Sequence, residues 1–168
     1  MLVYRLIKEK YLADPLSAEG AAKVGGRWNA EGTPMLYTSA NAATAKLEIL
    51  AGVNEYATLA EFKLVCLEIP DDSLYMMPLD ELVKAQKTMD SALAWDADIR
   101  PEFTVDIGET WFSSMETLAL GVPSSLSPHD YNILINTMHP DFDKVKVHKV
   151  TDEGVSQRLA IRQEPVGL

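Results

Sequence analysis

The stretch Gly25-Gly26-Arg27-Trp28-Asn29 is followed closely by Leu36-Tyr37-Thr38-Ser39 and then by Ala45-Lys46-Leu47-Glu48. These three stretches predict a loop, a short strand and a helix. A Gly-Gly pair adopts backbone angles closed to other residues and lets a ligand approach the main chain, so Arg27 is expected to project from a tight turn. The planar fork of an arginine donates two parallel hydrogen bonds to a phosphate group. This order of residues therefore suits a phosphorylated ligand.

A helix is predicted over residues 41–52, because apolar side chains recur there at helical spacing and Ser39 or Asn41 can cap the start. Glu48 borders this apolar stripe, whose members are Ala43, Leu47, Leu50 and Ala51. The carboxylate of Glu48 is expected to look into a cleft at the edge of the core, where its charge is poorly screened. Tyr37 ends a strand predicted at residues 35–38 and offers a ring on which a flat heterocycle can stack.

Each of these residues also has an ordinary structural explanation. The glycine pair can be a plain turn, Arg27 can form a structural ion pair, Tyr37 can be a core strand residue, and Glu48 can be a solvated helix position. The joint spacing of the residues favours a shared site over four separate structural roles.

The remaining periodicity predicts a mixed layout without repeats. Residues 61–69 are apolar on both faces, which is typical of a strand covered on two sides. Residues 117–122 predict a strand that delivers Ser124 at its end, and the irregular residues 94–104 are expected to overhang the cleft. Further strands are predicted at residues 2–7 and 144–150, and helices at 78–87 and 106–114. We therefore predict one α+β domain over residues 1–168, with a curved, largely antiparallel core.

Length and composition fit a single domain in a reducing compartment. A chain of 168 residues with 47% hydrophobic content is long enough to bury about 70% of its unfolded surface. Cys66 is the single cysteine, lies in an apolar run and is expected to be buried and unpaired. The amino terminus lacks a secretion signal, and no apolar stretch approaches the roughly 20 residues of a membrane span. These features predict a cytoplasmic protein with no membrane partner.

The charge of the chain argues against nucleic acid as a direct partner. The net charge is −10, whereas nucleic-acid binding depends on clustered lysine and arginine. Residues 70–117 hold 11 Asp or Glu against 3 Lys or Arg, a net of −8. This acidic segment can be a solvated surface that aids solubility, or it can be a docking face for a basic partner.

Other catalytic constellations have weak support. His129, His139 and His148 lack metal-ligand spacing and there is no second cysteine, so no metal site is predicted. Ser124 with a histidine and an aspartate could suggest a hydrolase triad, but no Gly-x-Ser-x-Gly elbow surrounds it. The chain also lacks the phosphate loop and the dinucleotide fingerprint of conventional nucleotide folds.

The motifs together resemble the RES-domain toxins of bacterial type II toxin–antitoxin pairs, which are named after an Arg, a Glu and a Ser. The resemblance covers nearly the whole chain. It is carried by the three stretches quoted above and by Val3-Tyr4-Arg5, Ile107-Gly108-Glu109-Thr110-Trp111, Val122-Pro123-Ser124, Asn132 to Asn136, and His139-Pro140-Asp141-Phe142. Family members often have Asn-Pro before the last motif, whereas this chain has Asn136-Thr137-Met138, which is expected to loosen that turn.

The resemblance implies specific residues, a fold and a substrate. Arg27, Glu48 and Ser124 match the naming residues, with Ser125 left open as an alternative serine, and Tyr37 and Asn132 are further pocket candidates. The fold is expected to be similar to the ADP-ribosyltransferase toxins. The implied substrate is NAD, with no resident cofactor. The implied partner is a helix-turn-helix antitoxin, and a homodimer within the toxin–antitoxin complex is left open.

The residues make chemical sense of NAD cleavage. Nicotinamide leaves NAD as a neutral base, so no general acid has to be supplied. Positive charge develops on the ribose as the bond stretches, and Glu48 is expected to stabilise it. Arg27 would anchor the diphosphate, Tyr37 would pack on nicotinamide or ribose, and Ser124 would orient the ribose or the amide.

Three functions remain open from the sequence. The chain can deplete NAD by hydrolysis or phosphorolysis, or it can transfer ADP-ribose to a specific cellular protein. It can also be a catalytically silent module that binds its partner. The joint presence of Arg27, Tyr37, Glu48 and Ser124 favours an enzyme, because a pure binding module has no need of all four.

Overall fold

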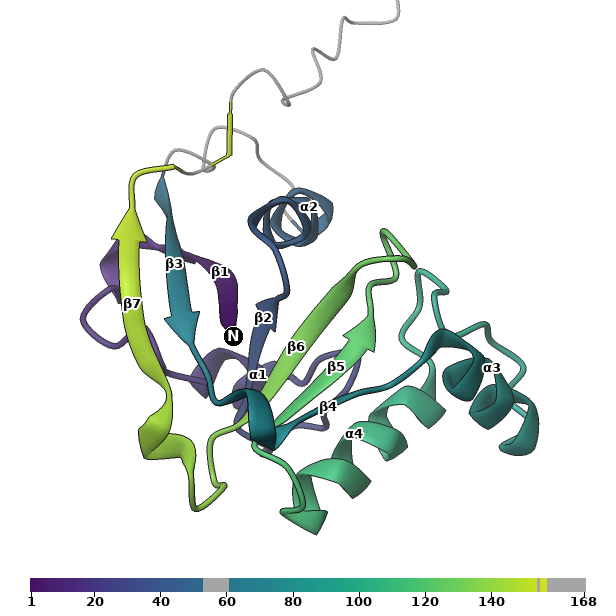
Figure 1. Ribbon diagram of the computed structural model, residues 1–168. Helices are drawn as coiled ribbons and strands as arrows, with labels where there is room; N and C mark the ends of the chain where they lie inside the picture. The colour runs from purple at the N-terminus through teal and green to yellow at the C-terminus, as the bar shows by residue number, and fades with distance from the viewer. Residues whose placement is uncertain (53–60, 154, 157–168) are drawn as a thin grey trace, which may run out of the picture.

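The computed structural model describes residues 1–52, 61–153, 155 and 156, so the last part of the predicted 1–168 domain lies outside the described residues. The described chain forms one sheet with helices on its outer faces (Figure 1). The strands are β1 (Leu2–Lys8), β2 (Met35–Ser39), β3 (Phe62–Glu68), β4 (Leu74–Met76), β5 (Ala119–Pro123), β6 (Tyr131–Asn136) and β7 (Lys146–Thr151). The helices are α1 (Glu19–Val24), α2 (Ala42–Gly52), α3 (Leu79–Thr88) and α4 (Glu102–Ser114).

The sheet has seven strands in the order β4-β5-β6-β2-β1-β3-β7. Only β4 and β5 pair in parallel, so the predicted α+β fold with a curved, largely antiparallel core is confirmed. The middle of the sheet is narrow, because β1 and β2 share the single register pair Tyr4 and Ser39. The strands β1, β3 and β7 therefore diverge from β2, β6 and β5, and α2 lies where they separate (Figure 1).

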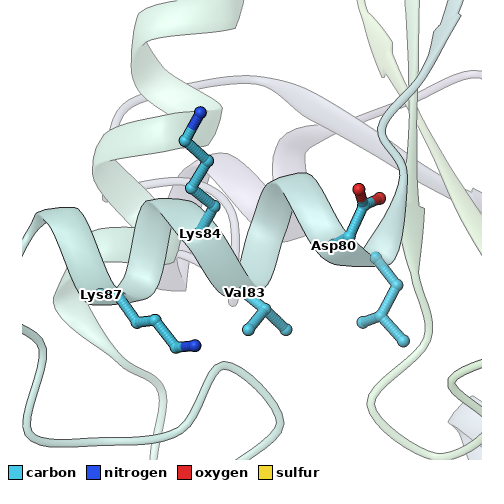
Figure 2. A pocket seen from close by; sticks show the side chains of 5 residues that line it. Asp80, Val83, Lys84 and Lys87 are labelled. Atoms are coloured by element: carbon cyan, nitrogen blue, oxygen red, sulfur yellow. The ribbon is translucent and has the colours of Figure 1, made fainter.

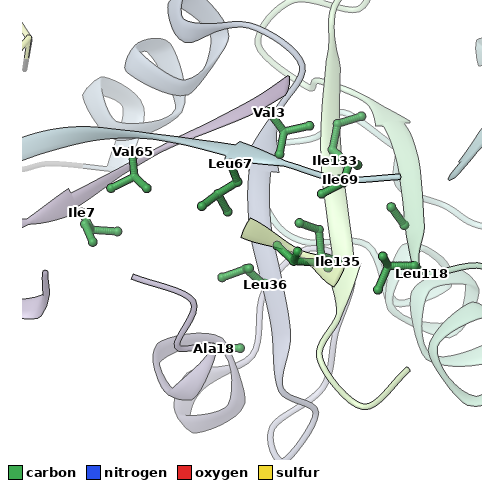
Figure 3. Close-up of a cluster of buried hydrophobic side chains, with 12 residues drawn as sticks. Val3, Ile7, Ala18, Leu36, Val65, Leu67, Ile69, Leu118, Ile133 and Ile135 are labelled. Atoms are coloured by element: carbon green, nitrogen blue, oxygen red, sulfur yellow. The ribbon is translucent and has the colours of Figure 1, made fainter. Parts of the chain in front are cut away.

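The main core fills the space between the two diverging halves of the sheet. Val3, Val65 and Leu67 point inward from β1 and β3, and face Leu36, Ile133 and Ile135 from β2 and β6 (Figure 3). A second cluster packs α3 and α4 against the outer face of β5 and β6, and a third packs α2 against β1 and β3. Cys66 is buried in β3 and unpaired, as expected.

The helix α2 forms where it was predicted, but of the four residues in the predicted apolar stripe just Leu50 packs against the sheet. Leu47 is 43% exposed, and Ala43 and Ala51 are also exposed. The side chains that pack against the sheet are instead Ala42, Ala45, Ile49 and Leu50. The stretch is apolar almost all round, so periodicity alone could not choose the buried face.

The helix α4 begins earlier than predicted. Its first residue is Glu102 rather than Asp106, because Pro101 sits at the N-cap with φ −71° and fixes an entry compatible with a helix. Phe103 and Phe112 anchor the longer helix in the second cluster. The short elements α1 and β4 and the strand β6 were not predicted, since they are brief or lack alternation.

Gly108 gives a direct test of how α4 packs. A Cβ on Gly108 would lie 1.8 Å from the carbonyl oxygen of Trp28, so Gly108→Ala is expected to destabilise the fold by about 1–3 kcal/mol. Gly20→Ala in α1 is the matched control, because a Cβ there meets no described atom within 4 Å, and it should stabilise by about 0.4–1 kcal/mol. Urea unfolding of both variants gives the comparison. Equal effects of the two substitutions would contradict the packing of Trp28 on α4.

Candidate functional site

Three strand ends and one helix meet at the edge of the sheet. Asn132, near the start of β6, pairs with Ser39 at the end of β2 and with Val122 near the end of β5. The chain leaves β5 at Pro123, so Ser124 follows directly at this edge, and its backbone N–H donates to the carbonyl of Asp130 at 2.9 Å. Because α2 contacts β1, β2 and β6, a side chain on its inner flank can reach these strand ends.

The carboxylate of Glu48 is the meeting point of these elements. Its Oε1 accepts a hydrogen bond from Ser124 Oγ at 2.9 Å and another from Asn132 Nδ2 at 2.5 Å. No donor in the described part of the chain bonds to Oε2. Ser124 is fully buried, whereas Glu48 and Asn132 are partly exposed. One oxygen of the carboxylate is therefore fixed by the protein, and the other has no donor among the described residues.

Ser124, and not Ser125, makes the bond to Glu48. The Ser124 hydroxyl also accepts the backbone N–H of Leu126 at 3.2 Å. Its position at the end of β5, after Pro123, is the one that the sequence predicts. Because Ser124 is fully buried, its hydroxyl contacts Glu48 and is not exposed to solvent.

The start of α2 is tied to the loop that carries Ser124. Asn41 Oδ1 accepts the backbone N–H of Thr44 at 2.8 Å, so Asn41 is the capping residue of the two that the sequence offered. Asn41 Nδ2 also donates to Asp130 at 3.1 Å, and Asp130 accepts the hydroxyl of Ser127 at 2.7 Å. The helix that carries Glu48 and the loop that carries Ser124 are thus held together at a second point.

The guanidinium of Arg27 donates hydrogen bonds to two backbone carbonyls of the protein. Its Nη1 donates to the carbonyl of Trp95 and its Nη2 to the carbonyl of Ala97, both at 2.8 Å. The segment that the sequence predicts to overhang the cleft is therefore fastened to Arg27. A guanidinium has five N–H groups, so others remain for a ligand.

Charge links Arg27 to Glu48. Burial lowers the pKa of the Arg27 guanidinium, and the nearby carboxylate of Glu48 opposes this shift, as do Asp96 and Asp98. An effect of this kind requires the two groups to lie within reach of one another. The charges of Arg27 and Glu48 therefore act on one another, while a shared ligand for the two groups stays a prediction.

The Gly25–Asn29 turn is shaped by Tyr37. The Tyr37 hydroxyl accepts the backbone N–H of Trp28 at 3.0 Å and donates to Asn29 Oδ1 at 2.8 Å. Burial is the main reason that the pKa of Tyr37 is raised, so the group is a neutral phenol. The hydroxyl has a structural use, while the ring stays partly exposed.

The two glycines of this turn are needed for different reasons. Gly25 has φ +69°, a conformation that other residues rarely adopt. A Cβ on Gly26 would lie 2.5 Å from the Tyr37 hydroxyl. The close approach expected of a ligand to this turn is therefore made by a side chain of the protein.

The helix α4 fixes the same segment from the other side. The Thr104 hydroxyl donates to the carbonyl of Arg27 at 2.8 Å. Glu109 accepts the backbone N–H of Ala30 at 2.8 Å and the hydroxyl of Thr33 at 2.9 Å. The Ile107-Gly108-Glu109-Thr110-Trp111 motif is thus explained by support of the Arg27 segment, which spacing in the sequence could not reveal.

The turn at Asn136-Thr137-Met138 is tied by hydrogen bonds despite its departure from the family pattern. Asn136 is fully buried, and its Nδ2 donates to the carbonyl of Phe112 at 2.8 Å. The Thr137 hydroxyl donates to the carbonyl of Pro34 at 2.6 Å, and the backbone N–H of Met138 donates to Asn136 Oδ1 at 2.9 Å. The expected loosening of this turn is not seen.

A shallow hollow lies elsewhere, along α3. It is lined by Leu79, Asp80, Val83, Lys84 and Lys87, all from that one helix (Figure 2). Charges of both signs line it, and none of the predicted site residues belongs to it.

In residues 1–52, 61–153, 155 and 156, no three side chains of His, Cys, Asp or Glu gather as metal ligands would. The helices within those ranges are all too short or too polar to cross a bilayer.

The similarity to known proteins extends over most of the chain. The RES domain model matches residues 2–160. The chain is 32% identical to a protein named Toxin Res from Photorhabdus laumondii, over 95% of this chain and 97% of that protein. It is 34% identical to the Prs ADP-ribosylating toxin of a Sphingobium species, over 83% of each.

A solved structure has the same fold. A chain in the crystal structure of the M. tuberculosis MbcT-MbcA toxin-antitoxin complex superposes with a TM-score of 0.71, covering 94% of this chain and 85% of that one at 17% identity. With the family model matched along most of its length and relatives above 30% identity, this chain belongs to the RES domain family of toxins.

Proposed function

We propose that this RES-family toxin cleaves the bond between nicotinamide and ribose in NAD, with Glu48 as the charged group beside the ribose. The observation that carries this proposal is the arrangement at Glu48. Two donors fix Oε1, and Oε2 has no donor among the described residues. A carboxylate held in this way is already oriented before substrate arrives, which is the condition for strong electrostatic stabilisation of a transition state.

The proposed reaction needs little proton transfer. The pair of electrons in the bond between ribose and nicotinamide moves to the pyridinium nitrogen, which becomes neutral as nicotinamide leaves. Positive charge then spreads over the ribose carbon and ring oxygen, and the anionic Glu48 lowers the energy of that state. An acceptor bonds to the same carbon and releases its own proton to solvent. NAD is a substrate in this scheme, and no resident cofactor takes part.

In this proposal the other residues hold the dinucleotide and the carboxylate. Arg27 offers its remaining N–H groups to the diphosphate while its two carbonyl bonds fix the plane of the fork. The partly exposed ring of Tyr37 packs on the nicotinamide or the ribose. Asn132 and Ser124 act on substrate through Glu48, since their side chains bond to its carboxylate.

The proposal has two forms, which differ in the molecule that accepts ADP-ribose. Water or phosphate as acceptor gives depletion of NAD by hydrolysis or phosphorolysis. A protein acceptor gives an ADP-ribosyltransferase, and the printed name of the Sphingobium relative, an ADP-ribosylating toxin, favours this second candidate. A silent binding module would not need the fixed carboxylate.

We also propose an antitoxin as the partner, because the structural neighbour is part of a toxin–antitoxin complex. A helix-turn-helix antitoxin that binds DNA would be basic and could dock on the acidic 70–117 segment. Asp71, Asp72, Asp80 and Glu81 are all exposed there. The α3 surface is not uniformly acidic, since Lys84 and Lys87 line the same hollow as Asp80 (Figure 2).

Glu48→Gln tests the reaction itself. The glutamine keeps an oxygen that can accept from Ser124 and Asn132 but removes the charge, so NAD should still bind while nicotinamide release slows by on the order of 10²–10³-fold. The measurement is nicotinamide release from NAD with and without phosphate, together with labelled ADP-ribose on protein to identify the acceptor. Glu116→Gln, at an exposed position, is the control. A rate close to the wild type in Glu48→Gln would remove Glu48 from the mechanism.

Arg27→Lys tests the proposed diphosphate anchor. Lysine keeps the charge but cannot hold two carbonyls and a diphosphate with one planar fork, so the dissociation constant for NAD should rise about tenfold or more. Titration calorimetry in a Glu48→Gln background measures binding without turnover. An unchanged dissociation constant would show that Arg27 serves only the 95–97 segment.

Charge reversal tests the docking face. Replacing Asp71, Asp72, Asp80 and Glu81 by lysine should slow association with the antitoxin and weaken the dependence of that rate on salt. The control reverses the same number of exposed acids outside the segment, at Glu19, Glu31, Asp143 and Glu153. Stopped-flow association over a range of salt concentrations compares the two variants. If both associate alike, the acidic segment is a solvated surface and not the antitoxin face.

A further inference from the structure

Ser39 occupies a distinctive place in the sheet. It is the last residue of β2 and pairs with Tyr4 of β1 on one side and with Asn132 of β6 on the other. Its pairing with Tyr4 is the one register pair that joins the two halves of the sheet. The side chain is only 3% exposed, so substrate does not reach it directly.

The hydroxyl of Ser39 bonds to the residue that holds Glu48. Ser39 Oγ donates to Asn132 Oδ1 at 2.7 Å, and Asn132 Nδ2 donates to Glu48 Oε1. The serine hydroxyl therefore meets the oxygen end of the amide, and the carboxylate meets the nitrogen end. These three side chains form one directed series from a buried strand end to the carboxylate of Glu48.

The order of donors and acceptors fixes the amide of Asn132. An amide can turn over and exchange its oxygen and nitrogen. In the turned orientation the amide oxygen would face the carboxylate of Glu48, and two acceptors would repel one another. With Ser39 removed, the amide oxygen of Asn132 would lose its donor at a partly buried site, so the side chain would gain by turning to another partner. Glu48 would then keep the bond from Ser124 alone.

We propose that Ser39 is a positioning residue, which holds Asn132 so that its amide N–H locates Glu48 Oε1 and keeps Oε2 directed at the ribose. This inference rests on the proposed cleavage of NAD. It adds a residue that the sequence did not identify, because Ser39 could be read there only as a possible helix cap. A displacement of about 1 Å at a reacting group costs about a hundredfold in rate, so a loosened Glu48 should affect the chemical step more than binding.

Ser39→Ala is the principal test. We expect kcat for nicotinamide release to fall about tenfold to a hundredfold, while KM for NAD stays within about threefold because Arg27 is untouched. Ser39→Thr keeps a hydroxyl donor and should restore most of the rate. The fraction of folded protein is measured by circular dichroism, so that kcat refers to folded enzyme. Unchanged kcat in Ser39→Ala would overturn the inference.

Thr38→Val is the matched control. Thr38 is the neighbouring residue of β2, is 4% exposed, and donates its hydroxyl to the carbonyl of Ile133 at 2.7 Å. This substitution removes a buried hydroxyl between the same two strands but leaves the bonds of Glu48 in place. It should change stability without changing kcat. A fall in kcat equal to that of Ser39→Ala would assign both effects to the strand pair and would overturn the positioning role.

A double-mutant cycle separates positioning from general damage. If Ser39 acts through Asn132, Ser39→Ala should lower kcat no further in an Asn132→Ala background. An equal further loss in that background would contradict the inference. The result for Glu48→Gln distinguishes the two proposals: a slow Glu48→Gln with a fast Ser39→Ala removes only the role of Ser39, whereas a fast Glu48→Gln removes the proposed function.

Discussion

The single register pair between β1 and β2, formed by Tyr4 and Ser39, is the constraint on which the arrangement of the site depends. Strands of a sheet twist relative to one another, and a junction of one pair lets the two halves diverge enough to enclose a core between them. The helix α2 follows β2 after a short capped turn and packs across the separation. Glu48 on α2 is thereby carried to the ends of β5 and β6, although those strands lie more than 70 residues further along the chain.

Arg27 is held in place for a different reason, which is that backbone carbonyls need hydrogen-bond donors. The irregular segment before α4 has no ladder partner for the carbonyls of Trp95 and Ala97, and both accept from Arg27. Buried carbonyls without a partner are costly, so the arginine stabilises the segment and the segment orients the arginine. Thr104 and Gly108 of α4 then lie against the backbone carbonyls of Arg27 and of Trp28. The proposed use of Arg27 as a diphosphate anchor is compatible with its structural use, because a guanidinium has more donors than the two carbonyls need.

Local pattern in the sequence was enough for the fold class and for much of the site. Hydrophobic patterning located β1, β2, β3, β5 and β7. The family resemblance singled out Glu48, Ser124 and Asn132, and the structure shows these three side chains in contact. The order of the strands could not be predicted, because the place of β6 between β5 and β2 depends on pairing over long separations. The buried face of α2 was misjudged because nearly every side chain around it is apolar. The contact of Ser39 with Asn132 was not predicted, because a serine next to a helix start suggests a cap. The register between β2 and β6 places the two residues opposite one another, and the Ser39 hydroxyl bonds to Asn132.

The proposed binding of a dinucleotide has to be reconciled with the acidity of the protein. The net charge is −10, so a long phosphate backbone meets repulsion over most of the surface. At the site, Arg27 is partly buried, whereas the neighbouring Asp96 and Asp98 are exposed and their charges are screened by solvent and salt. Screening weakens the exposed carboxylates more than the partly buried cation, so the field close to Arg27 stays attractive to one diphosphate. Extended binding of nucleic acid needs many such cations in a row, whereas the surroundings of Arg27 combine Asp96 and Asp98 with Arg100, which donates to the carbonyl of Gly26.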